Sequence, residues 1–465
     1  MANKQYDVTI IGAGPAGVFS AYELVKSNPE LKVLVLETGE DIYTRTCPIT
    51  TKKVPQCINC SICGIMRGFG GAGAFSDGKY NFTTTFGGWL NEYIADEQVM
   101  ELIHYVDQIN MAHGAPDESF STSQSNIGRE ALRHDLHLLE AEVKHLGTEN
   151  NLAILTAIYE ELKDKVEFRF RTSVTDILQT GDGFELNLVN HEDVVGCRYL
   201  IAAPGRAGAE WFTNQCKTLG LALTNNQVDV GVRVEVPADV FRHITDEVYE
   251  AKLVYRTKQY EDLVRTFCMN PNGYVVAENT DGIITVNGHS YRDTSLHSAN
   301  TNFALLVSNT LTHPFNEPHQ YGKRIASFSN MLGGGVLVQR FGDLMKGRRS
   351  TQHRLDQSFT RPTLEATPGD LSLVLPKRHL DNIIEMIYAL DNVAPGMANH
   401  DTLLYGVEVK FYSSRLTLTE QLETEIPNLF AIGDGAGITR GLSQASASGI
   451  LAARSIMQRL NKSCR

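Results

Sequence analysis

Short apolar runs and amphipathic stretches alternate at both ends of this 465-residue chain. Residues 8–11 and 33–36 form such runs, and the stretch between them has a helical pattern. Runs of this length, bounded by turn residues, favour buried strands of a parallel sheet. A further run at 429–432 precedes a predicted helix at 442–460. The pattern therefore predicts a strand–helix–strand unit at the start of the chain and a return to the same sheet near its end.

The region after the second run is less regular. An apolar spacing of about 3.6 residues dominates residues 89–165, including 131–139, and predicts helices there. Gly181-Asp182-Gly183 is a hairpin turn sequence that joins two strand patterns. The strands predicted in this part of the chain are 166–170, 174–178 and 184–189.

The first apolar run leads into a glycine-rich turn, Gly12-Ala13-Gly14-Pro15-Ala16-Gly17, in its full strand–helix–strand context. Gly12 permits the tight turn, Gly14 lets the backbone approach a pyrophosphate, and Gly17 lets the helix pack closely on the strand. The helix N-terminus directs N–H groups and positive potential at the phosphates. Glu37 closes the second strand, where a carboxylate binds a ribose 2′-hydroxyl and repels a 2′-phosphate. The motif predicts a site for FAD or NAD rather than NADP.

A second motif, near the other end of the chain, decides between FAD and NAD. Thr424 is followed by four residues, the apolar run 429–432 and then Gly433-Asp434. With this pair of motifs the chain resembles the glutathione-reductase-like FAD superfamily. The resemblance implies that Asp434 hydrogen-bonds the ribityl chain of FAD and that residues 435–437 lie close to the flavin. It also implies that 200–206, which contain Pro204-Gly205, end the small sheet beside FAD.

A second glycine-rich loop, residues 64–79, follows the first strand–helix–strand unit. The same resemblance implies that its glycines let the backbone crowd the cofactor and that Ser76 or Lys79 reaches the polar edge of the flavin. Besides Glu37 and Asp434, the residues expected to bind FAD are Gly12, Gly14, Pro15, Ala16, Gly17, Gly70, Gly71, Ala72, Ser76, Gly205 and Gly433.

Four of the eight cysteines precede this loop, at Cys47, Cys57, Cys60 and Cys63. Closely spaced thiolates converge on one soft metal centre at little entropic cost. A C-x2-C-x2-C run with a Cys-Pro pair is typical of ligands to a 4Fe–4S iron–sulfur cluster, although here the Cys-Pro pair precedes the run. Zinc bound by four thiolates, a redox pair of thiols near the flavin, and unligated thiols are the alternatives.

Further motifs make the resemblance narrower. The run 57–79, together with 333–340 and 367–370, resembles a family of bacterial FAD-dependent dehydrogenases known as NAD(P)/FAD-dependent oxidoreductases. The resemblance spans essentially the whole chain and implies a flavoprotein oxidoreductase, without an established substrate. The predicted fold is α/β, with a discontinuous, glutathione-reductase-type Rossmann-like FAD-binding domain at 1–206 and 415–465.

Residues 207–414 are predicted to be an inserted, mixed α+β domain that covers the substrate. They contain no second apolar strand followed by a G-x-G-x-x-G turn, so NAD(P)H as an electron donor stays open. The elements predicted here are strands at 228–236, 273–278 and 282–287, an apolar stretch at 303–307 and a helix at 379–390.

Candidate substrate-binding and catalytic residues lie in this inserted region. His289 follows a strand as a candidate proton donor, and Arg378 is a candidate anion anchor. Four polar residues alternate along a predicted strand at 404–413, which places members of the set on different faces: Tyr405, Glu408, Lys410 and Tyr412. A basic cluster favours either an anionic substrate or a solvated cationic loop, and it consists of Arg340, Lys346, Arg348, Arg349 and Arg354. The catalytic candidates are His289, Arg340, Arg378 and Lys410.

Composition limits the partners and the compartment. Hydrophobic residues make up 42% and charged residues 21% of the chain, as in ordinary globular proteins. The net charge of −12 argues against nucleic acid, whose phosphates require a basic surface. No apolar run reaches the ~20 residues that span a bilayer, and the first residues show no signal-peptide pattern. We expect a cytoplasmic protein that does not bind a membrane.

The function predicted from these motifs is a dehydrogenase or reductase. It would transfer hydride or electrons between FAD and an organic, anionic small-molecule substrate. One alternative is an electron-transfer flavoprotein that relays electrons between protein partners, including a protein electron donor. A second alternative is an FAD-containing RNA-modifying protein, against which the acidic charge weighs.

Overall fold

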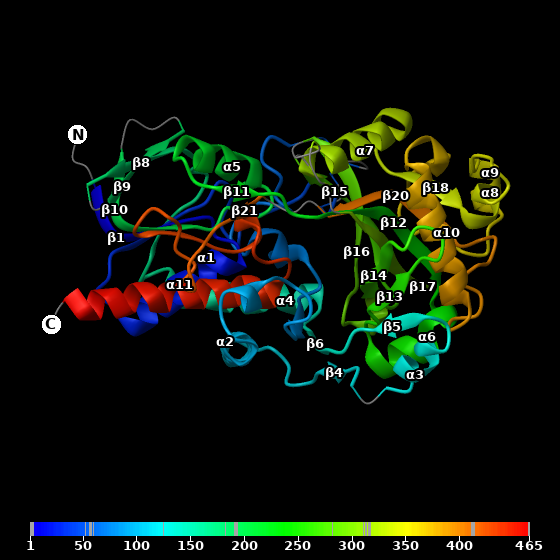
Figure 1. Ribbon diagram of the computed structural model, residues 1–465, viewed down its shortest axis with the longest axis horizontal. Helices are drawn as coiled ribbons and strands as arrows, with labels where there is room; N and C mark the ends of the chain where they lie inside the picture. The colour runs from blue at the N-terminus through cyan, green and yellow to red at the C-terminus, as the bar shows by residue number, and fades with distance from the viewer. Residues whose placement is uncertain are drawn as a thin grey trace. The chain divides into compact units, whose positions relative to one another are not determined.

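The computed structural model describes residues 4–463, apart from 52, 55–57, 59, 124, 182, 190–193, 281, 310, 312, 313, 315–317 and 411–413. The chain forms two compact units (Figure 1). Unit 1 comprises 1–117, 148–226 and 412–465, and unit 2 comprises 118–147 and 227–411. Segment 118–147, which the sequence groups with the first domain, belongs to unit 2. The reason is that β5 (Leu136–Leu138) pairs with β13 (Leu253–Arg256).

Unit 1 is built on a sheet whose centre is parallel. The strand β1 (Lys4–Ile11) lies between β2 (Val33–Leu36) and β10 (Val195–Ala202). The first half of β10 pairs antiparallel with β9 (Gly183–Leu188), and its second half pairs parallel with β22 (Leu429–Ala431). The other strands of this sheet are β7 (Glu167–Arg169), β8 (Val174–Thr180), β9 (Gly183–Leu188) and β22 (Leu429–Ala431). The predicted hairpin, the predicted return of the chain and the Rossmann-like α/β fold are confirmed.

Two helices from opposite ends of the chain pack together in unit 1. α1 (Pro15–Ser27) starts directly after the glycine-rich turn, and α11 (Leu442–Ser463) lies along it (Figure 1). Ser20 Oγ donates to the carbonyl of Gly449 at 3.0 Å, and a Cβ on Gly449 would lie 2.2 Å from the Ala16 carbonyl oxygen. Only glycine permits this approach, so α11 fixes the position of the N-terminus of α1.

The remaining helices of unit 1 support the same region. α2 (Asp96–Ala112) packs on α11, and α4 (Thr148–Leu162) packs on η1 (Gly71–Phe75), a short 3-10 helix in the second glycine-rich loop. None of the described helices combines the length and the apolar character needed to cross a bilayer.

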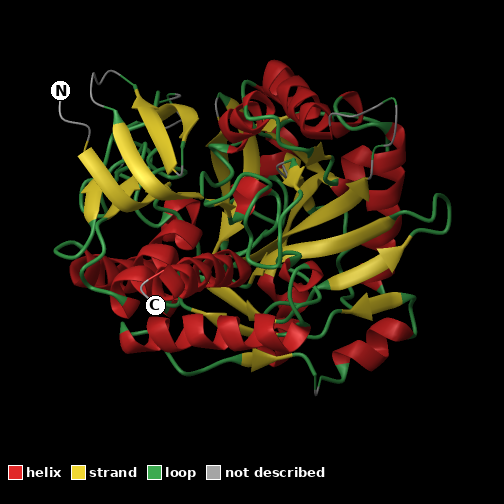
Figure 2. Cartoon of the chain, turned by 60° about the vertical axis from the view of Figure 1, so that its left-hand side comes forward, coloured by secondary structure: helices red, strands yellow, loops and turns green. Residues whose placement is uncertain are grey.

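Unit 2 is built on a largely antiparallel sheet with two different faces. The valines of β12 (Val228–Pro237) at alternate positions from 228 to 236 join an apolar core. Helices cover this face (Figure 2), namely α3 (Ile127–Leu132), α6 (Ala238–Val248), α7 (Pro318–Gly333) and α10 (Lys377–Asp391). The strand order is β19 (Thr367–Pro368), β18 (Leu337–Arg340), β20 (Leu403–Lys410), β12 (Val228–Pro237), β17 (Asn300–Asn309), β14 (Leu263–Asn270), β13 and β5.

The opposite face of this sheet carries buried polar residues. Asp229, Arg233 and Glu235 occupy the positions of β12 between the core valines, and all three are fully buried. The hairpin of β15 (Tyr274–Thr280) and β16 (Ile283–His289) covers part of this face through a small apolar cluster that includes Val275, Val286 and Tyr405. The predicted strands and the helix of the inserted domain are confirmed.

One predicted helix is wrong. The pattern at 131–139 is helical, but α3 ends at Leu132 and β5 begins at Leu136. Asp135 adopts a positive φ of 60°, which breaks the helix. Leu136 is fully buried in the core of unit 2 and pairs with Tyr255 of β13. Burial of this leucine at the sheet edge outweighs the local helical preference.

We predict a pH dependence of stability from His379 in α10. This ring is buried, and burial lowers its pKa to about 4, with Arg378 acting in the same direction and Asp262 opposing it. An unfolded histidine titrates near 6.5, so the unfolded state binds more protons between the two values. The contribution of the neutral His379 ring to the unfolding free energy is therefore fully present above about pH 6.5 and is lost as the pH falls toward about 4. Urea unfolding should show a loss of about 2 kcal/mol from this group between about pH 7 and pH 5.

The variant His379→Gln is the control for this prediction. It removes the titrating group, so its unfolding free energy should change less between the two pH values than that of the wild type. Equal changes in both proteins would show that His379 makes no such contribution.

Candidate functional site

The glycine-rich turn lies at the carboxyl ends of the central parallel strands of unit 1. Gly12 adopts a φ of +101°, and a Cβ there would lie 2.2 Å from the Ala203 carbonyl oxygen. A Cβ on Gly17 would lie 2.0 Å from the Gly12 carbonyl oxygen. A Cβ on Gly14, by contrast, would meet nothing within 4 Å. The turn is therefore packed tightly against its own strands and leaves open space in front of Gly14.

The second glycine-rich loop lies against this turn. Gly70 N–H donates to the Ala13 carbonyl at 2.7 Å, and a Cβ on Gly71 would lie 3.0 Å from Gly14 Cα. Gly73 approaches Pro15 in the same way, since a Cβ there would lie 3.3 Å from the proline ring. Ser76 Oγ donates to the Gly73 carbonyl at 2.7 Å, which closes η1. The structure thus brings the two predicted glycine-rich segments together.

Glu37 joins three parts of the site. One carboxylate oxygen accepts from the Ala13 N–H at 2.8 Å, and the other accepts from Gly39 N–H at 2.8 Å and Gly68 N–H at 2.9 Å. A carboxylate offers about four acceptor positions, so one is left for a ribose hydroxyl. The predicted ribose-binding carboxylate therefore also holds the two glycine-rich segments in register.

We expect Glu37→Gln to lower the unfolding free energy by about 2 kcal/mol, because the amide nitrogen cannot accept one of these hydrogen bonds. FAD affinity should fall in the same variant, since the segments that line the site lose their common acceptor. Urea unfolding and FAD titration measure the two effects. Glu30→Gln, an exposed residue of the same unit, is the control and should change neither quantity. An unchanged unfolding free energy in Glu37→Gln would contradict this role.

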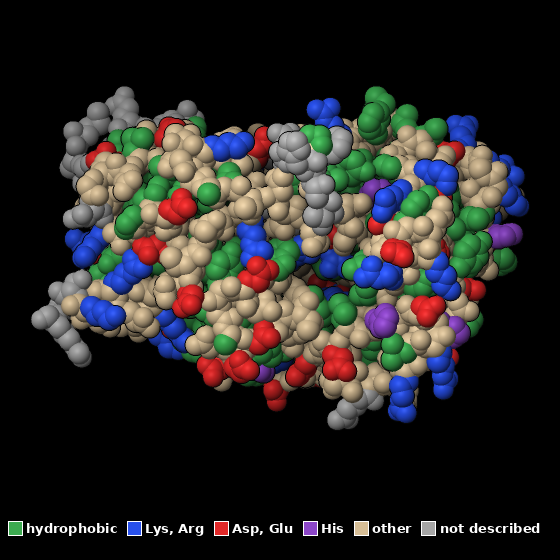
Figure 3. All heavy atoms as spheres, in the orientation of Figure 1, with side chains coloured by type: hydrophobic (Ala, Val, Ile, Leu, Met, Phe, Trp, Pro, Cys, Tyr) green, Lys and Arg blue, Asp and Glu red, His purple; other side chains and the backbone are tan. Residues whose placement is uncertain are grey.

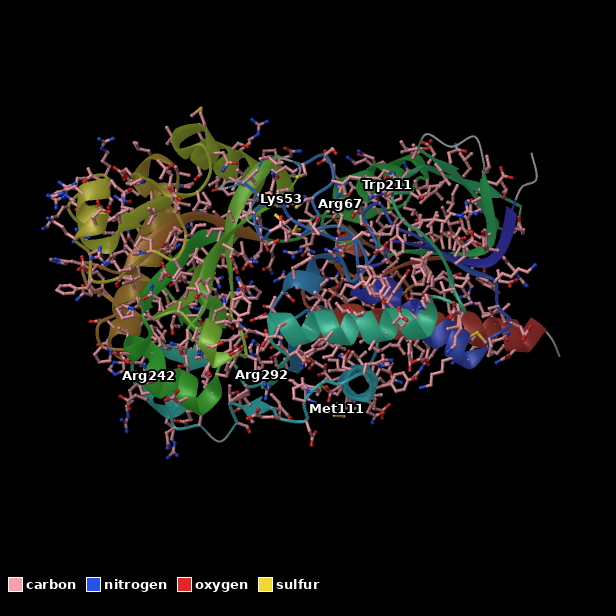
Figure 4. The ribbon with its side chains drawn as sticks, turned by 180° about the vertical axis from the view of Figure 1, so that it is seen from behind. Lys53, Arg67, Met111, Trp211, Arg242 and Arg292 are labelled. Atoms are coloured by element: carbon pink, nitrogen blue, oxygen red, sulfur yellow. The ribbon has the colours of Figure 1, made fainter. Side chains whose placement is uncertain are left out.

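Arg45 holds the second loop in place by hydrogen bonds, and no pattern in the sequence indicates this role. Its guanidinium is buried and donates to the Gly64 and Ile65 carbonyls at 2.9 Å and to the Phe69 carbonyl at 2.5 Å. Burial lowers the pKa of Arg45 to about 10, and Glu37 and Cys63 act in the opposite direction. Arg67, labelled in Figure 4, donates to the carbonyl of Ala207 at 3.2 Å.

The C-terminal motif meets the same edge of the sheet. Ile432 N–H donates to the Ala202 carbonyl at 3.0 Å, and Gly433 follows with a φ of 71°. A Cβ on Gly435 would lie 2.6 Å from the Pro204 ring and 2.8 Å from the backbone of Gly205. The segments after β10 and β22 therefore touch each other, beside the glycine-rich turn that follows β1.

Asp434 is held in a defined orientation at this edge. Its Oδ1 accepts from the Thr439 hydroxyl at 2.7 Å, and Arg206 Nε lies 3.9 Å from its Oδ2. Burial raises the pKa of Asp434, while Arg206 and Thr439 lower it. Thr424, the first residue of the motif, ties a turn through its N–H bond to the Leu429 carbonyl at 2.9 Å. The threonine thus shapes the approach to β22.

The turns after β1, β10 and β22 meet at the topological switch point of the sheet, where the chain continues to one side of β1 and later returns on the other side. β2 lies on one side of β1 and β10 lies on the other, and Ala203 N–H donates to the Ile11 carbonyl at 2.8 Å. In open α/β sheets, ligands bind outside the carboxyl ends of the strands at this switch point. The open space at Gly14, the uncapped N-terminus of α1 and the carboxylate of Glu37 are the features that FAD requires there.

The described cysteines of the cluster form no recognisable metal site. Cys57 lies outside the described residues, and Cys47, Cys60 and Cys63 precede the second glycine-rich loop. Within the part of the chain that is described, no group of three or more histidine, cysteine, aspartate or glutamate residues is arranged to hold a metal ion. The iron–sulfur and zinc interpretations are unsupported by this part of the structure.

Three of the predicted catalytic residues each have their own partners in unit 2. Arg340 forms an ion pair with Asp401 at 2.6 Å. Arg378 donates twice to Asp262, at 2.7 and 2.6 Å, and its side chain is 56% exposed. His289 ends β16 and packs its ring against those of Tyr274 and Tyr291. These arginines have internal carboxylate partners.

The predicted basic cluster is organised around Asp343. This buried carboxylate accepts from Arg348 Nε and Ser350 Oγ, each at 2.8 Å, and Arg354 Nε lies 3.8 Å away. Burial raises the pKa of Asp343, but the hydrogen bonds from Ser350 and Arg348 outweigh it and leave the pKa below its ordinary value. At least two cations of this cluster therefore act within the protein itself.

The prediction that members of this set lie on different strand faces is wrong for Tyr405, Glu408 and Lys410, and Tyr412 lies outside the described residues. In β20, Tyr405 is opposite Arg233, whereas Glu408 is opposite Gly231, and the register shifts between these pairs. One extra residue on β20 therefore intervenes, which is a β-bulge. The bulge turns Tyr405, Glu408 and Lys410 to the same polar face of the unit 2 sheet.

Comparison with known families adds one observation about unit 2. Residues 227–411 match the profile of a protein family described as "FAD-dependent protein, C-terminal domain-like". This stretch of the chain is similar to the C-terminal domain of FAD-dependent proteins. No curated protein sequence matches the chain significantly.

Several solved structures resemble the fold at low similarity. Glycine oxidase from Geobacillus kaustophilus is 12% identical with a TM-score of 0.40, over 98% of this chain and 95% of that chain. The halogenase PltM is 12% identical with a TM-score of 0.43, over 99% and 71%. The E. coli quinol fumarate reductase FrdA is 14% identical with a TM-score of 0.41, over 100% and 72%.

Proposed function

We propose that this protein is an FAD-dependent oxidoreductase that acts on a small organic substrate. The observation that carries the proposal is the convergence, in unit 1, of the turns after β1, β2, β10 and β22 around the open space at Gly14. The match of residues 227–411 to a domain of FAD-dependent proteins supports it.

The residues of unit 1 fit FAD in three ways. Gly14 and the N-terminus of α1 would hold the pyrophosphate, because N–H groups and the helix dipole favour negative charge there. Glu37 would accept from the adenosine ribose, and Asp434 would accept from the ribityl chain. FAD, when bound, supplies a group that takes up or donates hydride or single electrons.

A small-molecule substrate is preferred over nucleic acid in this proposal. The net charge is −12, and acidic and basic side chains are interspersed on the face shown in Figure 3. Phosphate-rich partners require a continuous basic surface.

The test is an anaerobic reduction of the purified, FAD-reconstituted protein. We expect bound flavin to be reduced by NADH, NADPH or an organic substrate, and to be reoxidised by a small-molecule acceptor with multiple turnovers. Flavin that is reduced only by a protein partner would instead favour the electron-transfer alternative. A protein that retains no FAD after reconstitution would overturn the proposal.

A further inference from the structure

Three cations of unit 2 surround a single aromatic ring. Lys252 Nζ, Arg265 Cζ and Lys410 Nζ lie 5.9, 5.3 and 5.6 Å from the centre of the Phe267 ring. Their side chains are 9%, 18% and 10% exposed, so each is largely withdrawn from water but reaches the surface. We call these four residues the Phe267 cluster. Cations are rarely gathered in this way unless an anion or a carboxylate compensates them.

The strands bring the cluster together through two irregularities. Arg265 is opposite Leu306 of β17 and Phe267 is opposite Ala304, which places both on the polar face of the sheet. The register of β14 then shifts after Phe267, and Cys268 adopts a φ of 49°. The bulge in β20 turns Lys410 to the same face. Bulges and positive φ at a non-glycine residue are concentrated at functional sites, where they re-aim side chains.

The cluster has carboxylate partners, but one of them is shared. Lys252 pairs with Glu250 at 3.7 Å, and Arg265 pairs with Asp229. Glu408 lies 2.8 Å from Lys410 and 3.3 Å from Arg233, which is fully buried. One carboxylate charge cannot neutralise two cations. The group of Arg233, Glu408 and Lys410 therefore carries one positive charge in excess.

Arg233 is fixed in place and cannot turn toward a ligand. Its guanidinium donates to the Asn302 side-chain oxygen at 2.9 Å and to the Cys268 carbonyl at 2.7 Å. A Cβ on Gly288 would lie 2.3 Å from Arg233 Nη2, so β16 covers this group. Lys410, at the edge of the same network and 10% exposed, is the cation that a ligand can reach.

We propose that the Phe267 cluster is a binding site within unit 2 for a carboxylate-bearing small molecule, with Lys410 as the main contact. This inference goes beyond the proposed function, because it concerns a second ligand site that is separate from the FAD site of unit 1. A carboxylate carries the single negative charge that the excess on Arg233 and Lys410 requires. A phosphate carries more charge, so Asp229, Glu250 and Glu408 would repel it more strongly than they repel a carboxylate. Withdrawal from water strengthens the attraction.

The experiment is calorimetric titration of the FAD-reconstituted full chain. The probes are the monocarboxylates propionate and benzoate, their neutral amides propionamide and benzamide, and inorganic phosphate. We compare the wild type with Lys410→Gln, which keeps the length of the side chain and removes its charge. Lys377→Gln is the matched control, because Lys377 is 80% exposed on α10 and pairs only with Asp381 among the described ion pairs.

We expect the wild type and Lys377→Gln to bind at least one carboxylate equally and to bind neither amide. Lys410→Gln should bind the same carboxylate at least tenfold more weakly, as expected for the loss of one charge-assisted hydrogen bond. Lys252→Gln should show a loss in the same direction, and it serves as the second variant if Lys410→Gln does not fold by circular dichroism.

Three results would overturn the assignment. They are equal carboxylate affinity in wild type and Lys410→Gln, no binding of either carboxylate by the wild type, and Lys410-dependent binding of phosphate in preference to both carboxylates. The flavin absorbance that each sample retains shows whether FAD is bound, and this tests the proposed function independently of carboxylate binding. Carboxylate binding by a protein that retains no FAD would support the cluster assignment and refute the flavoenzyme proposal. FAD binding without carboxylate binding would support the flavoenzyme proposal and refute the cluster assignment.

Discussion

Replacing Gly14 with valine is expected to abolish FAD binding while the protein still folds. Gly14 has an ordinary backbone conformation, with φ −72° and ψ −179°, and a Cβ there meets nothing within 4 Å. The substitution therefore fits the protein and fills the space where the pyrophosphate must approach the backbone. We expect at least a ~100-fold loss of affinity, equivalent to about 2.8 kcal/mol. Titration of the apoprotein with FAD measures the affinity, and thermal unfolding of the same apoprotein measures the fold.

Gly128→Val is the matched control for this substitution. Gly128 lies in α3 of unit 2, and a Cβ there would make only ordinary contacts with Leu138, at 3.8 Å. FAD affinity should be unchanged in this variant. If Gly14→Val bound FAD as tightly as the wild type, the pyrophosphate could not lie at this turn.

Replacing Glu408 with glutamine is expected to lower the unfolding free energy by about 3–5 kcal/mol, because it leaves two cations without their shared carboxylate. Arg233 is fully buried and is too tightly held to reach water. Urea unfolding, monitored by circular dichroism, measures the difference. Glu118→Gln is the control. Glu118 pairs with Arg292 in unit 2, and its side chain is 59% exposed. Such a pair contributes at most about 1 kcal/mol.

A double variant makes this second prediction sharper. Arg233→Met combined with Glu408→Gln removes one buried cation together with the carboxylate, so part of the lost stability should return. A loss below about 1 kcal/mol in Glu408→Gln alone would show that this network does not hold unit 2 together.

The unit 1 fold was predictable because its signals are local. The glycine-rich turn needs a strand before it and a helix after it, and both are visible in the sequence as apolar periodicity. The run at 429–432 before Gly433-Asp434 is equally local. Arg45 was not predictable, because its role depends on carbonyl groups that only the folded loop brings together.

The polar face of unit 2 was only partly predictable. The alternation of valine with Asp229, Gly231, Arg233 and Glu235 is visible in the sequence, but alternation alone is equally typical of a strand with one solvated face. The bulge in β20 leaves no local signal, because a one-residue shift depends on pairing with β12. The sequence therefore identified Lys410 as a candidate but did not show which face of the sheet it lies on. The helix predicted at 131–139 is wrong because Leu136 pairs with β13 at the edge of the sheet.

The most direct test of this account is equilibrium titration of the apoprotein with FAD, NAD and NADP, followed by flavin fluorescence for FAD and by calorimetry for all three. One FAD should bind per chain, more tightly than NAD, and NADP should bind least of all because Glu37 repels a 2′-phosphate. Binding of NAD or NADP in preference to FAD, or the absence of any dinucleotide binding, would contradict the assignment of unit 1.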